Sequence, residues 1–148
     1  MQGHVVSINI ATENSGPMQS VPEIRAVAGK GLEGDRYFAS DKEGGGRHAT
    51  LIELEAIEAL EREHGLKLSP GDARRNIVTR GVALNDLVDR EFLVGGVRML
   101  GVKLSEPCAH LASLTDEKVL KGLVHRGGLR ADILSDGVIR PGDAVADT

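Results

Sequence analysis

Aromatic side chains are almost absent from this chain of 148 residues, which has two Phe, one Tyr and no Trp. Proteins that bind single-stranded nucleic acid depend on aromatic platforms for base stacking, so this shortage argues against that class. The core must instead be built from Val, Leu, Ile and Ala. The 19 Gly indicate a fold with many turns.

A single cysteine, Cys108, excludes an intrachain disulfide and gives no sign of an oxidising compartment. The N-terminal residues 1–7 lack a basic region followed by an apolar one, and no apolar run reaches the length of a membrane span. The net charge of −4 gives no basic surplus for binding nucleic acid or a membrane surface. We therefore expect one soluble domain over residues 1–148, in the cytoplasm, with neither nucleic acid nor membrane as partner.

Short segments of alternating polarity, separated by turns, predict a mainly β fold with a few helices. The expected strands are 4–10, 22–28, 76–79, 92–94, 97–105, 129–134 and 144–146. Thr50 and Glu53 fit a capping box, which predicts a helix over 51–64 ending at Gly65, and a shorter helix is expected over 115–121. The glycine-rich stretch 29–46 is predicted to be a mobile, functional loop. A closed or partly closed β-barrel is the simplest architecture for this pattern.

Cys108 lies in the segment Glu106-Pro107-Cys108-Ala109-His110. If this segment is extended, Cys108 and His110 project from the same face, and a neighbouring cation favours the reactive thiolate. Pro107 cannot donate to a β-ladder, which predicts that Cys108 lies at a strand end or edge. The alternative is a buried cysteine that packs as a small hydrophobic side chain. The segment by itself leaves both interpretations open.

Three groups of side chains suit an anion. They are Gly34-Asp35-Arg36 with Arg47-His48, then Arg74-Arg75-Asn76, then 125–130 with Arg126 and Arg130. Arginine offers a planar donor fork that matches phosphate, and glycine lets backbone N–H groups approach the same anion. The alternative for each group is a solvated surface arginine. Asp35 is better suited to fixing an arginine or a loop N–H than to acting as a nucleophile.

Several well-known site patterns are missing. Gly29-x-Gly31-x-x-Gly34 leads into a polar loop rather than a helix, so it does not predict a dinucleotide site. The chain has no Gly-Lys-Ser/Thr phosphate loop and no Gly-x-Ser-x-Gly nucleophile turn. Without a Cys-x-x-Cys or His-x-x-x-His pair, we do not expect a preformed structural zinc centre.

Taken in order, the segments 31–37, 47–55 and 75–84 resemble the MOSC domain, the C-terminal module of molybdenum cofactor sulfurases that also occurs as stand-alone bacterial proteins. Glu106-Pro107-Cys108 falls where the family carries its characteristic cysteine. The closing segments 126–131 and 141–143 fit the stand-alone members. The resemblance covers residues 20–146 and implies a β-rich, barrel-like fold with a pocket for the molybdenum cofactor.

The resemblance also implies roles for particular residues. Cys108 would be the sulfur-bearing or metal-ligating thiolate, with His110 beside it and Asp35 orienting the glycine-rich loop. The candidates for the pterin phosphate are Arg36, Arg47, Arg75, Arg126 and Arg130, and Asn76 would make a polar pterin or backbone contact. The chain contains no pyridoxal-phosphate sulfurase module, so no pyridoxal phosphate site of its own is expected.

Two functions remain open from the sequence. The first is a molybdenum-cofactor-binding protein that uses Cys108 as metal ligand or sulfur carrier and supports reduction of N-hydroxylated compounds with an electron-donor protein. The second is a non-catalytic carrier that delivers sulfur or cofactor. Besides the cofactor, the expected partners are an electron donor or a cysteine desulfurase, and a second copy of the chain in a homodimer. An anion-binding regulatory domain unrelated to molybdenum is a third idea.

Overall fold

The computed structural model describes residues 2–13, 15–38 and 46–147, apart from the side chains of residues 2, 109 and 110. Its strands are β1 (Gln2–Ile10), β2 (Gln19–Ser20), β3 (Ile24–Val27), β4 (Gly31–Leu32), β5 (Ala49–Glu53), β6 (Ile77–Arg80), β7 (Glu91–Val94), β8 (Val97–Leu104), β9 (Leu129–Ile133), β10 (Gly137–Ile139) and β11 (Ala144–Asp147). The described helices are α1 (Leu54–His64), α2 (Ala109–Leu114) and α3 (Lys118–Gly122), with 3₁₀ turns η1 (Pro70–Ala73) and η2 (Leu84–Leu87). None of the described helices is long and apolar enough to cross a membrane.

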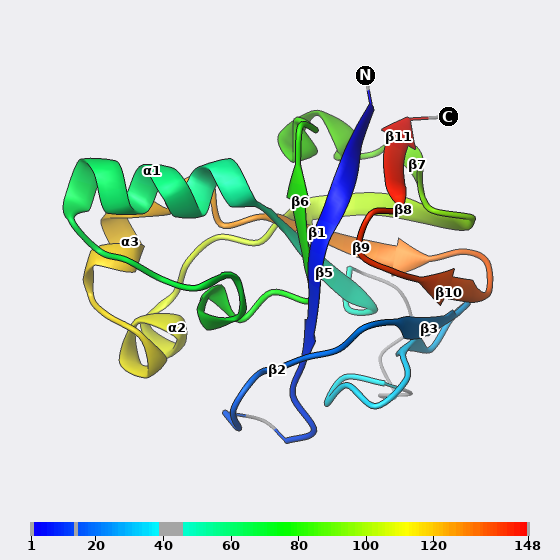
Figure 1. Cartoon of the computed structure of the whole chain (residues 1–148), viewed down its shortest axis with the longest axis horizontal. Helices are drawn as coiled ribbons and strands as arrows, with labels where there is room; N and C mark the ends of the chain where they lie inside the picture. The colour runs from blue at the N-terminus through cyan, green and yellow to red at the C-terminus, as the bar shows by residue number, and fades with distance from the viewer. Residues whose placement is uncertain (1, 14, 39–45, 148) are drawn as a thin grey trace.

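Seven strands close into a barrel in the order β11-β7-β8-β9-β5-β6-β1. The closing contact is the antiparallel pairing of β1 with β11, in which Gly3 lies opposite Val145. β5 and β6 run parallel, and β2 extends the sheet beyond β1. A separate three-stranded sheet, β10-β3-β4, lies beside the barrel, and the two termini lie close together (Figure 1). The mainly β, barrel-like fold expected from the sequence is therefore confirmed.

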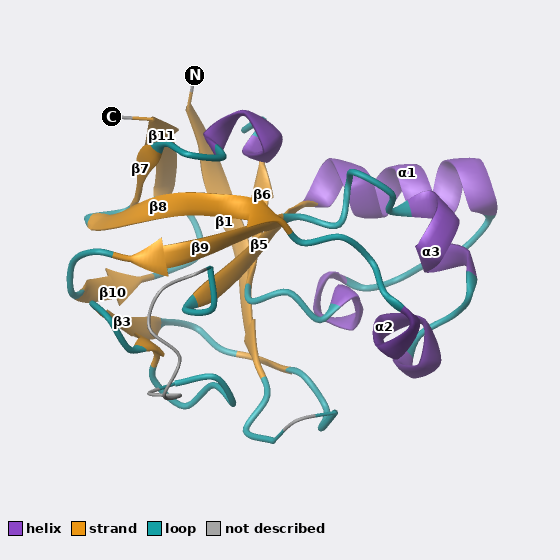
Figure 2. Cartoon of the chain, turned by 180° about the vertical axis from the view of Figure 1, so that it is seen from behind, coloured by secondary structure: helices purple, strands orange, loops and turns teal. Residues whose placement is uncertain are grey.

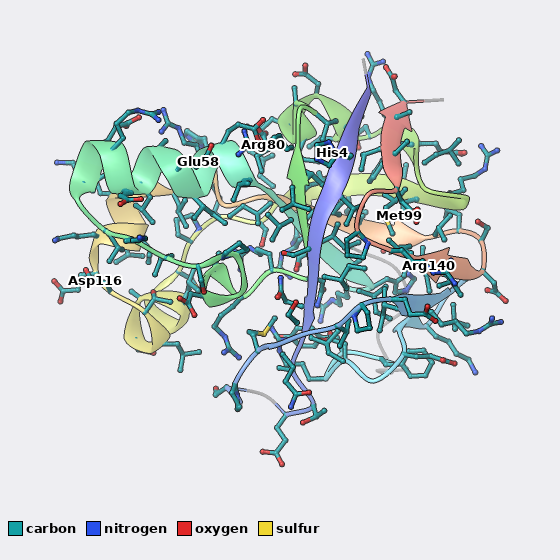
Figure 3. The ribbon with its side chains drawn as sticks, viewed as in Figure 1. His4, Glu58, Arg80, Met99, Asp116 and Arg140 are labelled. Carbon is teal, nitrogen blue, oxygen red and sulfur yellow. The ribbon has the colours of Figure 1, made fainter. Side chains whose placement is uncertain are left out.

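The barrel interior is filled by aliphatic side chains, as the shortage of aromatics requires. Because side chains alternate across a strand, every second residue of β7 and β8 points inward, and these include Phe92, Val94, Val97 and Met99. All four are fully buried, and Met99 lies within the barrel in Figure 3. The Gly95-Gly96 hairpin turn joins the two strands as expected, with Val94 paired to Val97.

The three helices gather on one side of the barrel (Figure 2). A second apolar cluster joins them, with Leu60 from α1, Leu111 from α2, and Val119 and Leu123 around α3. On the outer side, Arg80 at the end of β6 forms an ion pair with Glu58 of α1 at 2.8 Å (Figure 3). The cluster anchors α2, which follows directly after Cys108.

Two local predictions from the sequence are wrong. Thr50 does not cap a helix, because it lies within β5, which is held between β6 and β9. The helix begins at Leu54, and Glu53 occupies its N-cap position without a side-chain capping hydrogen bond. Residues 109–114 form α2 instead of continuing an extended segment, so Cys108 is not at a strand end. Of the predicted glycine-rich loop, residues 31–32 form β4, whereas 39–45 lie outside the described residues. The left-handed stop at Gly65 is confirmed, and the short helix predicted over 115–121 is found over 118–122.

The partly buried carboxyl of Glu53 should make the stability of the protein depend on pH. Burial raises the pKa of this carboxyl above the ordinary value. The hydrogen bond that Oε2 accepts from the Leu84 N–H at 3.2 Å lowers the pKa, but its effect is smaller than that of burial. A raised folded-state pKa means that the folded protein binds the proton more tightly, so stability falls as pH rises through that pKa. We expect Glu53→Gln to be more stable than the wild type at pH 7, with a smaller difference at about pH 4. Urea unfolding at both pH values measures this, and a difference that widens at low pH would contradict it.

Candidate functional site

A cavity of about 110 Å³ brings the single cysteine together with four arginines. The described residues that line it are Ser15, Arg36, Tyr37, Arg74, Arg75, Cys108, Leu111, Leu114 and Arg130. They come from the segment between β1 and β2, the turn after β4, the chain after η1, helix α2 with its N-cap, and strand β9. Three of the five arginines predicted from the sequence, Arg36, Arg75 and Arg130, thus meet Cys108 in one place.

Cys108 occupies the N-cap of α2, with an extended backbone conformation. It is a free thiol and is exposed, so it does not pack as a buried hydrophobic residue. Its carbonyl accepts a hydrogen bond from the Ala112 N–H at 3.0 Å, and the next inward residue, Leu111, is buried against the helical cluster. The thiol is therefore accessible but attached to a fixed helix start. The side chain of His110 lies outside the described residues.

Arg74 is a cavity residue that the sequence analysis grouped with its neighbours but did not assign. It follows η1 in a left-handed conformation, with φ 61° and ψ 30°, which is uncommon for a residue other than glycine. Burial and the nearby Arg36 cation lower its pKa from the ordinary arginine value. Within the described part of the chain, its guanidinium has no hydrogen bond or ion pair, so its donors are available to a ligand.

The guanidinium of Arg75, unlike that of Arg74, is hydrogen-bonded to the backbone. Its Nε donates to the Gly127 carbonyl at 2.7 Å and its Nη2 to the Ser105 carbonyl at 3.0 Å. Burial lowers the pKa of Arg75 to about 10, helped by the Arg130 cation and opposed by Cys108. The guanidinium therefore stays protonated at neutral pH, and two of its three nitrogens are committed to backbone.

Arg36 and Tyr37 form the rim on the β4 side. The Asp35 carboxylate is buried and accepts hydrogen bonds from the Ala11 N–H at 3.1 Å and from Arg36 Nη1 at 3.3 Å. The Arg36 guanidinium also stacks on the Tyr37 ring, 4.6 Å from its centroid. Asp35 thus holds the turn and its arginine, as a positioning group would, and it makes these contacts within the chain.

Arg130 completes the cavity from β9, and its guanidinium likewise makes no hydrogen bond within the described residues. Four arginines therefore line the cavity, with Asp35 as a counter-charge beside Arg36. Concentrated positive charge of this kind, partly shielded from water, favours an anionic ligand.

The other predicted site residues lie elsewhere. Arg47 is exposed and does not line the cavity, and Arg126 pairs with Glu63 of α1 at 3.1 Å, in a different hollow. Asn76 is buried, with its amide oxygen bonded to Thr50 and its amide nitrogen to the Asn9 carbonyl. Asn76 therefore ties strands together next to Arg75 and does not face the cavity. Throughout the described residues, no three His, Cys, Asp or Glu side chains are grouped to hold a metal ion.

A larger groove of about 670 Å³ adjoins this cavity and shares Arg74 and Leu114 with it. Its polar lining includes Ser7 and Asn9 of β1, and its apolar lining includes Met18. A ligand larger than a single anionic group would find room there beyond Arg74.

Solved structures with the same fold are known. YuaD of Bacillus subtilis superposes with a TM-score of 0.84 at 16% identity, over 98% of this chain and 94% of that one. YiiM of Geobacillus stearothermophilus gives 0.75 at 17%, over 99% and 75%, and YiiM of Escherichia coli gives 0.73 at 18%, over 100% and 70%. At these identities the likeness establishes the fold. A comparison with curated proteins gave no match.

The family is shown by the sequence itself. Residues 39–146, which include Cys108, Arg74, Arg75 and Arg130, match the MOSC domain. The match spans most of the barrel and all of the described helices. The chain therefore belongs to the MOSC domain family, a family associated with the molybdenum cofactor.

Proposed function

We propose that this protein binds the molybdenum cofactor at the Cys108 cavity and uses the Cys108 thiolate as metal ligand or sulfur carrier. The observation that supports this most strongly is that one exposed cysteine and four arginines line a single cavity. Thiolates are soft ligands that suit a soft metal centre, whereas arginine forks suit phosphate. The donor set thus fits a ligand that carries both a metal and a phosphate.

Different residues of the cavity would bind different parts of the cofactor. Arg74 and Arg130, whose donors are free within the described chain, would hold the anionic groups, and Arg36 would add charge from the rim. The groove beyond Arg74 offers space for the remainder of the cofactor. When bound, the cofactor supplies a redox-active molybdenum centre. The reaction proposed for it is reduction of N-hydroxylated compounds, with electrons from a partner protein.

A carrier without turnover is the second candidate, supported by the exposure of Cys108. In that role the thiolate attacks the terminal sulfur of a persulfide on a donor such as a cysteine desulfurase. The sulfur–sulfur bond of the donor breaks, its thiolate leaves, and Cys108 becomes the persulfide. No external oxidant is needed, since the sulfur moves at its existing oxidation level.

Metal and pterin content tests the proposal. The wild type, Cys108→Ser and the surface control Leu120→Ser are purified from a host that makes molybdenum cofactor. We expect molybdenum and pterin fluorescence to occur together in the wild type and the control, and both to fall about tenfold or more in Cys108→Ser because the metal loses its thiolate. Equal content in all three proteins would contradict Cys108 as the metal ligand and leave only its role as sulfur carrier. Turnover with an artificial electron donor then separates the enzyme from the carrier.

A further inference from the structure

The four residues 105–108, which we call the cysteine segment, lie against the turn formed by residues 125–128. The Ser105 N–H donates to the Gly128 carbonyl at 2.8 Å. Glu106 binds His125 twice, accepting from its backbone N–H and pairing with its Nδ1, each at 2.7 Å. Gly127 packs so closely on the Ser105 carbonyl and Pro107 that a Cβ would not fit. The position of Cys108 therefore depends on this turn.

Arg75 bridges the two segments from inside. Its Nε and Nη2 donate to one carbonyl on each, Gly127 and Ser105, so the planar guanidinium spans the junction. Asn76, the next residue, is fixed in the barrel wall by hydrogen bonds to Thr50 and Asn9. The bridge is thus attached to the rigid part of the fold.

The contrast with the other cavity arginines is clear. Within the described residues, the guanidinium groups of Arg74 and Arg130 make no hydrogen bond, whereas two guanidinium nitrogens of Arg75 donate to backbone carbonyls. A donor already bonded to a carbonyl is not available to an anion. The cavity therefore contains two kinds of arginine, which the sequence does not distinguish.

We propose that Arg75 is a positioning residue, whose guanidinium fixes the cysteine segment so that the Cys108 thiol stays beside Arg74 and Arg130. The inference rests on the proposed role of Cys108 and deepens it, because it states which residue holds the thiol near the positive charge of the other cavity arginines. Lysine at position 75 would keep the charge, but its single ammonium lacks the planar fork that spans two carbonyls. Arg75→Lys thus separates positioning from charge.

The test uses the protein without cofactor, so its outcome is independent of metal content. Cys108 is alkylated with anionic iodoacetate and with neutral iodoacetamide, each at a pH where the rate no longer rises. In the wild type we expect a preference for iodoacetate about tenfold above that of a free thiol, because the arginines attract the anion. The variants are Arg75→Lys, Arg75→Met and Arg130→Met, with the exposed Arg98→Met as matched control.

We expect Arg75→Lys and Arg75→Met both to lose most of this preference, while the dissociation constant of inorganic phosphate for Arg75→Lys stays within about threefold of the wild type. Arg130→Met should lose preference and phosphate affinity together. Hydrogen exchange at the Ser105 amide should accelerate in Arg75→Lys, with the barrel strands unchanged. This measurement remains decisive if Arg75→Met does not fold.

Four results would overturn the proposal. A wild-type preference no larger than that of a free thiol would show that the arginines do not act on Cys108. An Arg75→Lys protein that keeps the wild-type preference would show that charge alone matters. Phosphate binding weakened about tenfold or more in Arg75→Lys, with the preference intact, would make Arg75 a ligand. Faster exchange throughout the barrel would make its role one of general stability.

Discussion

Replacing both Arg74 and Arg130 by methionine is expected to weaken the binding of inorganic phosphate by about a hundredfold. Each guanidinium offers charge-assisted hydrogen bonds worth about 1.5–3 kcal/mol, and neither is engaged elsewhere in the described chain. Methionine keeps an unbranched side chain of similar length, so the change removes charge and donors more than volume. Isothermal titration at low ionic strength measures the effect.

The control for this experiment is Arg98→Met together with Arg140→Met. These two arginines are exposed and pair with Glu91 and Glu23, respectively. The double control changes net charge by the same amount as the double cavity variant, so it accounts for long-range attraction of phosphate. A loss of affinity in the control equal to that in the cavity variant would show that the cavity is not the phosphate site.

The backbone conformation of Arg74 also supports a role of this residue in binding an anion. Its left-handed conformation costs an ordinary residue about 1 kcal/mol relative to glycine, yet the residue there is an arginine whose guanidinium makes no hydrogen bond to the described residues. Strain of this kind is often found where a side chain is held for binding. Arg74 therefore combines an unfavourable conformation with a position at the junction of cavity and groove.

The barrel could be predicted from the sequence because its signals are local. The alternation along residues 97–101 and the Gly95-Gly96 turn require no knowledge of distant contacts. The predicted cap at Thr50 failed for the opposite reason: a local pattern that favours a helix start was overruled by pairing of β5 with β6 and β9. Glu53 instead accepts a hydrogen bond from Leu84, 31 residues away.

The candidate site could be predicted only in part, because the sequence gives the residue types but not their distant partners. Residue chemistry identified Cys108 as a candidate reactive thiol and Arg36, Arg75 and Arg130 as suited to an anion, and the fold brings the four residues together. Residue chemistry alone could not show that Arg126 forms an ion pair with Glu63, since the two residues are distant in sequence. Nor could it show that Arg75 donates to two carbonyls while Arg74 has no partner for its guanidinium in the described part of the chain, because adjacent side chains diverge according to backbone conformation.

Gly128→Ala is expected to destabilise the protein by about 4 kcal/mol or more, enough to leave much of a marginally stable chain unfolded. Gly128 has φ 111°, and a Cβ there would overlap the Leu51 carbonyl in β5. That contact is with backbone in the barrel wall, which cannot move aside as a flexible side chain can. The Gly128 carbonyl also accepts the Ser105 N–H, so the same position supports the cysteine segment.

Two other glycines separate the causes of this effect. Gly142 also has a positive φ, 94°, but no atom within 4 Å of an added Cβ, so Gly142→Ala should cost about 1 kcal/mol from conformation alone. Gly96 has neither a positive φ nor a neighbour within 4 Å, and Gly96→Ala should change stability by less than about 0.5 kcal/mol. Urea unfolding followed by circular dichroism gives the three values. Equal losses for Gly128→Ala and Gly142→Ala would show that β9 can shift away from β5, and the cysteine segment would then not be held by a rigid wall.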